Sequence, residues 1–232
     1  MKKIINLLSG ITLILALTAC GTSGAEAGKD KDAASKEQAA NSLQTQQTDM
    51  GKALVVYFSM PETTNPNNMT KAEADSTVIV DGKVLGNTQY AATVIQENTG
   101  ADMFPIEPKT PYPTDHGTLV EQAEKEKENK LRPEIKNRIE DISQYDTIFL
   151  GYPTWWSDMP MILYSFLDEY DLSGKTIIPF NTHGGSGFAN TIDTISELEP
   201  DATVNKNGFT VSRDNVQEAE NDIIVWLSGL KE

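Results

Sequence analysis

The chain has 232 residues, of which 38% are hydrophobic and 23% are charged, and its formal net charge is −15. This length and composition suit one globular domain of ordinary core size with a shorter additional segment. The acidic excess argues against nucleic acid and anionic lipid surfaces as partners, because both bind clustered lysine and arginine. It favours solubility and, less strongly, a basic docking partner.

The N-terminal segment has the three-part layout of a secretory signal. Lys2 and Lys3 precede an apolar stretch at residues 4–17, and a Leu-Thr-Ala sequence leads to Cys20, the single cysteine of the chain. The sequence before Cys20 resembles the bacterial lipobox. The apolar stretch is shorter than the roughly 20 residues of a membrane-spanning helix, which disfavours an uncleaved anchor. We therefore expect a lipoprotein signal peptide at residues 1–19, with cleavage before Cys20 and lipidation of its thiol.

The next segment, residues 21–51, is polar, and its only large apolar side chains are Leu43 and Met50. Such a composition cannot bury enough apolar surface to form a folded unit. We expect residues 20–51 to be a flexible tether that begins at the lipidated cysteine. It would hold a domain formed by residues 52–232 on the outer side of the cytoplasmic membrane.

From residue 52 onward, strand-like and helix-like patterns alternate. Strands are expected at residues 53–58, 102–106, 147–151, 176–180 and, less clearly, 209–211. Helices are expected at residues 88–98, 118–129, 160–170, 189–198 and 216–230. Five strands alternating with helices predict a parallel sheet covered by helices on both faces.

In such a sheet, ligands bind beyond the carboxyl ends of the strands. Ser59 follows the first strand, and the adjacent Trp155 and Trp156 follow the third. Exposed indoles are costly unless a flat group covers them, although one core and one surface tryptophan is the alternative interpretation. The segment 181–191 after the fourth strand contains three glycines. Glycines let backbone amides approach a planar or anionic group closely, and an ordinary glycine-rich turn is the alternative.

Five motifs, in this order, resemble the flavodoxin-like family. They are VVYFS at residues 55–59, GNT at 86–88, PYPTD at 111–115, GYPTWW at 151–156 and THGGSG at 182–187. The resemblance covers about residues 52–230. It implies a three-layer α/β sandwich with a five-stranded parallel sheet in the order 2-1-3-4-5 and FMN at the switch between the first and third strands.

The resemblance also implies an interrupted phosphate loop. In the family, a Ser-x-x-Gly-Asn-Thr loop runs from the first strand directly into the first helix. Here Ser59 and Gly86 are separated by an insert at about residues 60–85. Asp81-Gly82 between two apolar runs predicts a β-hairpin within this insert. We expect the loop to be completed after the hairpin, where the amino end of a helix at residues 89–95 would receive the phosphate.

The cofactor-binding residues are carried over from the family by these motifs. The resemblance implies a phosphate site at Ser59, Gly86, Asn87, Thr88 and Gln89, one side of the flavin ring at Pro153, Thr154, Trp155 and Trp156, and the other edge at Thr182, His183, Gly184, Gly185 and Gly187. Simple helix capping is the alternative role for Asn87 and Thr88. A solvated hydrogen-bonding residue is the alternative for His183. No catalytic residue and no metal site are expected.

These features favour an FMN-binding electron-transfer protein anchored outside the cytoplasmic membrane. Its expected partner is an unidentified redox protein or small electron acceptor. The stacked indole and the acidic surroundings predict a low reduction potential. One alternative is an FMN-dependent NAD(P)H reductase of quinones or other small acceptors, which the scarcity of nicotinamide donors outside the cell disfavours. The other is a binding module that kept the fold and lost the flavin.

Overall fold

The computed structural model describes residues 50–230, all of which belong to the unit Gln47–Glu232. The expected signal peptide at residues 1–19, Cys20 and almost all of the expected tether at 20–51 lie outside the described residues. Within residues 50–230, no helix combines the length and apolar character needed to cross a membrane.

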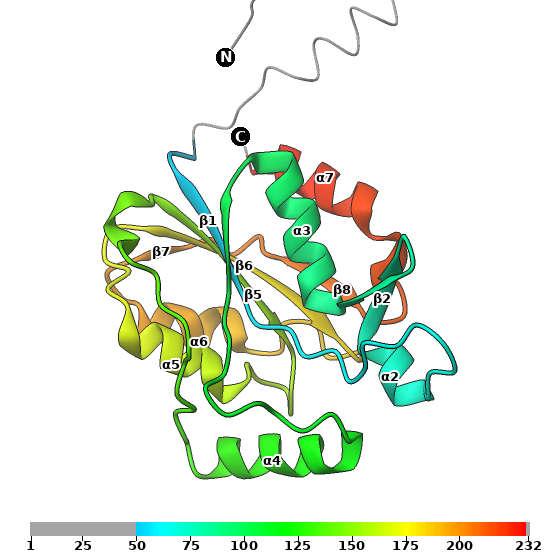
Figure 1. Ribbon diagram of the computed structural model, residues 1–232. Helices are drawn as coiled ribbons and strands as arrows, with labels where there is room; N and C mark the ends of the chain where they lie inside the picture. The colour runs from blue at the N-terminus through cyan, green and yellow to red at the C-terminus, as the bar shows by residue number, and fades with distance from the viewer. Residues whose placement is uncertain (1–49, 231–232) are drawn as a thin grey trace, which may run out of the picture. The chain divides into compact units, whose positions relative to one another are not determined.

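A parallel sheet forms the centre of the fold (Figure 1). Its strands are β1 (Ala53–Tyr57), β4 (Asp102–Pro105), β5 (Thr147–Pro153), β6 (Thr176–His183), β7 (Thr203–Val204) and β8 (Phe209–Ser212). The order is β4-β1-β5-β6, and both β7 and β8 pair with β6. Because β7 and β8 occupy successive parts of the same edge, they form one interrupted fifth strand. The expected order 2-1-3-4-5 is therefore confirmed.

Helices cover both faces of this sheet (Figure 1). The helices α3 (Asn87–Thr99) and α7 (Glu220–Gly229) pack on one face, and α5 (Met161–Glu169) and α6 (Thr191–Leu198) pack on the other. The remaining long helix, α4 (His116–Glu128), lies beyond the carboxyl ends of the strands. Two 3-10 turns, η1 (Ile142–Gln144) and η2 (Val216–Glu218), precede β5 and α7.

The central strands are continuously apolar because helices cover both faces of the sheet. Val55 and Val56 of β1 are both fully buried, yet they belong to separate clusters on opposite faces. Successive strand side chains point to opposite faces, so a strand covered on both sides needs an apolar residue at every position.

The insert contains the expected hairpin and one unexpected helix. Strands β2 (Thr77–Val80) and β3 (Lys83–Gly86) pair antiparallel, with Asp81 and Gly82 both at positive φ in the turn. A short helix, α2 (Lys71–Asp75), precedes the hairpin, and Thr70 and Glu73 form a capping box at its start. The sequence contains this Thr-x-x-Glu capping signal. The helix was not predicted because the residues before it are rich in proline and asparagine, which are typical of loops.

Several strand ends differ by one or more residues from the sequence prediction, and the largest difference is at β6. β6 continues to His183, three residues beyond the predicted end at 180, because Thr182 pairs with Pro153 of β5 and His183 pairs with Ser212 of β8. β7 was not predicted, since a two-residue strand has no periodic pattern to recognise.

Candidate functional site

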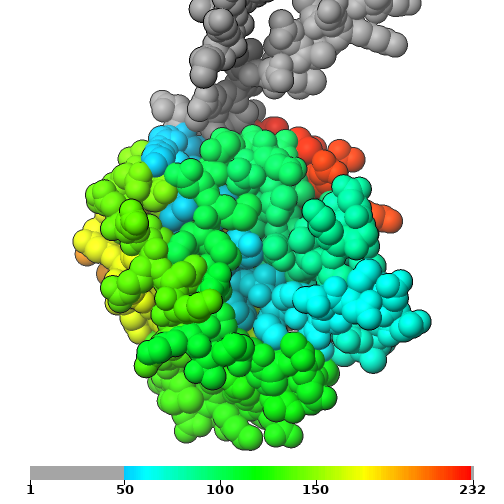
Figure 2. All heavy atoms as spheres, in the orientation of Figure 1, coloured from blue at the N-terminus to red at the C-terminus, as the bar shows by residue number. Residues whose placement is uncertain are grey.

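A cavity of about 320 Å³ opens at the carboxyl ends of the sheet strands. In Figure 2, the cyan insert and the green segment that holds α4 border a recess floored by the light-blue residues that follow β1. The lining residues come from the strand ends, the insert, α3, α4 and the segment after β8: Ser59, Met60, Glu62, Ala72, Asp75, Ser76, Asn87, Thr88, His116, Leu119, Val120, Ala123, Pro153, Thr154, Trp155, Trp156, Thr182, His183, Gly184 and Arg213.

Ten of the fourteen predicted cofactor-binding residues line this cavity: Ser59, Asn87, Thr88, Pro153, Thr154, Trp155, Trp156, Thr182, His183 and Gly184. The other four, Gly86, Gln89, Gly185 and Gly187, adjoin it without lining it. Three strand ends and the start of α3 therefore bring together residues that are far apart in the sequence. Within residues 50–230, no group of three His, Cys, Asp or Glu side chains is arranged to hold a metal ion.

Residues 153–156 form an aromatic wall in which the two indoles differ. Trp155 packs edge-on against Phe58 and Tyr112, with ring centroids 5.5 and 5.6 Å away. Trp156 is 46% exposed, and its Nε1–H donates to the Val120 carbonyl of α4 at 3.2 Å. The first indole is therefore partly buried against the core, while the second extends along the rim toward α4.

Hydrogen bonds fasten this wall to the glycine-rich loop that follows β6. The Thr154 hydroxyl donates to the Gly187 carbonyl at 3.0 Å, and the Thr154 amide donates to the Thr182 carbonyl at 2.8 Å. The buried Asn181 side chain donates to the same Thr154 hydroxyl and to the same Gly187 carbonyl. The two loops are consequently held in one fixed arrangement.

His183 lies where the glycine-rich loop enters the cavity. Its Nδ1 accepts a hydrogen bond from the Gly185 amide at 2.8 Å, so in the neutral ring the proton is on Nε2. Partial burial lowers the pKa of His183 below its ordinary value of 6.5. The ring is therefore neutral at pH 7, with one N–H donor remaining.

A helix terminus that binds phosphate offers unpaired amides, but most backbone amides at the start of α3 are already bonded within the chain. The Asn87 amide donates to the Ser76 carbonyl, the Gln89 amide donates to Ser59 Oγ, and the Gly86 amide donates to Gln89 Oε1, each at 3.2 Å. Within residues 50–230, the Thr88 amide is the one donor of this turn without a partner. The insert accounts for part of the difference, because it returns the chain so that Ser76 lies against the helix start.

The hydroxyl of Thr88 is also engaged, since its Oγ1 lies 2.9 Å from Thr182 Oγ1 and both side chains are buried. Only one of the two hydroxyls can donate across this contact. The other hydroxyl hydrogen is therefore free for a ligand in the cavity.

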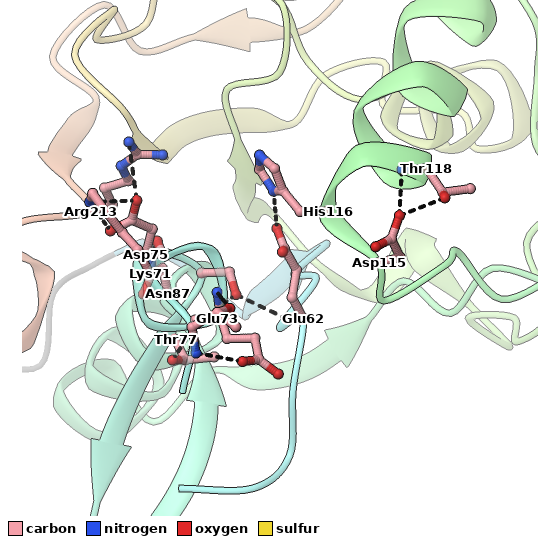
Figure 3. Close-up of polar contacts among 12 residues, drawn as sticks. Glu62, Lys71, Glu73, Asp75, Thr77, Asn87, Asp115, His116, Thr118 and Arg213 are labelled. Carbon is pink, nitrogen blue, oxygen red and sulfur yellow. Dashed lines mark hydrogen bonds and ion pairs between the residues drawn. The ribbon is translucent and has the colours of Figure 1, made fainter. Parts of the chain in front are cut away.

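Polar residues of the insert form the wall opposite the aromatic one, and we call Glu62, Asp75 and Ser76 the insert wall. The Asp75 carboxylate pairs with Arg213 at 3.3 Å and with Lys71 at 2.8 Å, and its backbone carbonyl accepts from the Asn87 side chain at 2.8 Å (Figure 3). Asn87 Oδ1 is buried and has no hydrogen-bond partner within residues 50–230. A ligand donor in the cavity would satisfy it.

A second contact joins the insert to α4. His116 Nδ1 lies 2.9 Å from Glu62 Oε1, and the Glu62 side chain is 7% exposed whereas that of His116 is 54% exposed (Figure 3). His116 begins α4, and it lies at the rim of the cavity.

Neither the insert wall nor Arg213 is among the binding residues predicted from the sequence. No local signal marks Glu62 or Asp75, because their position depends on how the insert folds back. Arg213 had a recognisable signal: it directly follows the strand predicted at residues 209–211, and the carboxyl ends of parallel strands are where ligands bind.

Known proteins share this fold. The family model for flavodoxin matches residues 78–229. A protein from Bacteroides eggerthii, provisionally assigned as a flavoprotein, is 29% identical with a TM-score of 0.58, and the match covers 77% of this chain and 96% of that one. A flavoprotein of Lactobacillus acidophilus, crystallised in complex with FMN, is 18% identical with a TM-score of 0.51, and the match covers 76% and 99% of the two chains. No curated protein matches this chain significantly.

Proposed function

The chain belongs to the flavodoxin family, and we propose that it binds FMN in the cavity at the carboxyl edge of the sheet and carries electrons outside the cytoplasmic membrane. The observation that carries the proposal is the convergence of ten expected cofactor-binding residues on one cavity. The FMN complex of the Lactobacillus acidophilus flavoprotein, which has the same fold, supports the choice of cofactor.

The residues present fit a flavin mononucleotide. The aromatic wall offers a flat apolar surface to the ring, and Trp155 is held rigidly by two aromatic neighbours. The unpartnered Asn87 Oδ1 is an acceptor that suits a hydroxyl of the ribityl chain. Ser59, the Thr88 amide and the free hydroxyl hydrogen of the Thr88–Thr182 pair supply donors for the phosphate end.

Bound FMN would supply transfer of one or two electrons at its ring. Trp155 and Thr154 would exclude water from one side of that ring and fix its position. Neutral His183 would offer an N–H donor without adding a positive charge. With a formal net charge of −15 on the chain, this environment disfavours additional negative charge, so we expect a low reduction potential.

The size of the cavity favours a carrier over a nicotinamide-dependent reductase. Small-molecule sites range from roughly 300 to 1,000 Å³. At about 320 Å³, this cavity is at the lower end, and the aromatic wall and the glycine-rich loop, joined by hydrogen bonds, border it. Electron transfer to a docked partner requires only an exposed ring edge.

An absorption spectrum of the purified protein, before and after addition of FMN, tests the flavin proposal. We expect bound flavin absorption that persists through gel filtration. A protein that stays colourless after incubation with excess FMN would instead favour the flavin-free binding module.

Steady-state assays separate the carrier from the reductase. We expect slow or no oxidation of NADH and NADPH by the flavin-loaded protein, but ready photoreduction and fast reoxidation by an added acceptor. Rapid turnover of either nicotinamide with a quinone would overturn the carrier assignment.

The membrane attachment rests on the sequence before Cys20. We propose that a lipid on this cysteine anchors the protein and that residues 21–51 serve as its tether. Changing Cys20 to Ser should release the protein from the membrane fraction or leave the signal peptide uncleaved. Normal processing and unchanged membrane retention of this variant would argue against a lipid anchor.

A further inference from the structure

Among the described residues that line the cavity, Arg213 is the one arginine or lysine. It directly follows β8, and its backbone amide donates to the His183 carbonyl at 2.8 Å. Its guanidinium packs against Gly184, where an added Cβ would lie 3.4 Å from Arg213 Cζ. The side chain therefore crosses from the fifth strand over the glycine-rich loop toward the insert wall (Figure 3).

The guanidinium keeps most of its donors available. Within residues 50–230, its one ionic partner is Asp75, through a single contact of 3.3 Å between Nη2 and Oδ2. Arginine has five N–H donors in a planar fork that matches carboxylate or phosphate oxygens in pairs. With the side chain 39% exposed, the remaining donors can reach an anion in the cavity.

The start of α3 leaves few of its own donors for a nucleotide phosphate, and a cation beside it would add to them. Three of its amide donors are already bonded within the chain. The Asp75 carboxylate in the neighbouring insert wall would repel an anion. Asp75 also links Arg213 to the start of α3. Its carboxylate contacts Arg213, and its backbone carbonyl accepts a hydrogen bond from the Asn87 side chain.

We propose that Arg213 binds the phosphate of the flavin nucleotide and that Asp75 positions its guanidinium beside the start of α3. This inference rests on the proposed function, since it assigns one end of the same ligand. A phosphate monoester would then be held by a cation from the fifth strand together with Ser59 and the Thr88 amide.

The test compares FMN with riboflavin, which lacks the phosphate, by fluorescence titration of the full chain purified in detergent. Arg213→Gln should raise the Kd for FMN by about tenfold to a hundredfold, as expected for loss of a charge-assisted hydrogen bond. The Kd for riboflavin should change less than about twofold, which also shows that the variant is folded. FMN binding by the wild type should weaken with added salt, and this dependence should be smaller in the variant.

Arg138→Gln is the matched control, because Arg138 pairs with Glu169 away from the cavity and should leave both affinities unchanged. Equal weakening of FMN and riboflavin by Arg213→Gln would overturn the phosphate assignment while leaving flavin binding intact. An unchanged Kd for FMN would overturn it as well. Failure of the wild type to bind either flavin would instead refute the proposed function.

Discussion

The two walls of the cavity are built in different ways. The aromatic wall at residues 153–156 continues directly from β5, and it is fastened by buried hydrogen bonds and by the packing of Trp155 on Phe58 and Tyr112. The insert wall of Glu62, Asp75 and Ser76 contacts the rest of the domain through the Asp75–Arg213 ion pair, the Glu62–His116 hydrogen bond and backbone hydrogen bonds. One wall is an extension of the core, and the other is a polar addition to it.

Because of this difference, we expect substitutions in the two walls to have different effects on stability and on ligand binding. Aromatic pairs in a packed cluster contribute to the free energy of unfolding, whereas partly exposed ion pairs contribute about 1 kcal/mol or less. Substitutions in the aromatic wall should therefore affect both folding and flavin binding. Substitutions in the insert wall should affect mainly the ligand.

The largest effect is expected from Trp155→Ala. Removing a tryptophan that packs on two aromatic neighbours should lower the free energy of unfolding by about 3 kcal/mol and weaken FMN binding. Trp156→Ala is the matched control, because that indole is 46% exposed and should cost about 1 kcal/mol or less. Urea denaturation of both variants measures the difference. Equal losses in the free energy of unfolding would show that Trp155 contributes no more to stability than Trp156.

Gly86→Ala tests the contact between Ser59 and the start of α3. An added Cβ would lie 2.2 Å from Ser59 Oγ, so the serine must rotate and lose its bond to the Gln89 amide. We expect a loss of about 2 kcal/mol in the free energy of unfolding, together with weaker FMN binding. Adding Ser59→Gly to this variant should restore part of the stability without restoring the affinity. If the double variant is no more stable than the single one, the clash with Ser59 is not the cause.

Thr88→Ala should have a smaller effect. The substitution removes the buried hydroxyl contact with Thr182, at a cost of about 1 kcal/mol in the free energy of unfolding. It should weaken FMN more than riboflavin, because the hydroxyl pair faces the phosphate end in the proposed arrangement. Thr88→Ser keeps the hydroxyl and should retain the wild-type preference in paired titrations. An equal loss of affinity for FMN and riboflavin would show that Thr88 does not contact the phosphate.

The smallest effect is expected outside both walls, at Glu199 after α6. Burial, and then the Asp171 and Asp168 carboxylates, raise the pKa of Glu199 to about 7 from the ordinary 4.5. Because the folded pKa lies above the unfolded one, stability should fall as the pH rises through this interval. Glu199→Gln should therefore raise the melting temperature at pH 8, leave it unchanged at pH 4 and leave FMN affinity unaltered. Melting curves with the same pH dependence as the wild type would refute this role.

Much of the fold could be predicted from the sequence, because the deciding signals are local. Buried parallel strands require continuous apolar runs, as at residues 53–57 and 148–150, and the Asp81-Gly82 turn requires positive φ at two adjacent positions. The resemblance of five motifs to flavodoxins then supplied the strand order and half of the residues that line the cavity. Each of these inferences depends on a few neighbouring residues.

The tertiary structure alone decided how the insert meets the site. Nothing near Asp75 in the sequence indicates that it pairs with Arg213. The interruption of the fifth strand into β7 and β8 is likewise set by pairing with β6. Local sequence specifies backbone conformation through periodicity and turn chemistry, whereas contacts between distant segments depend on how the whole chain packs.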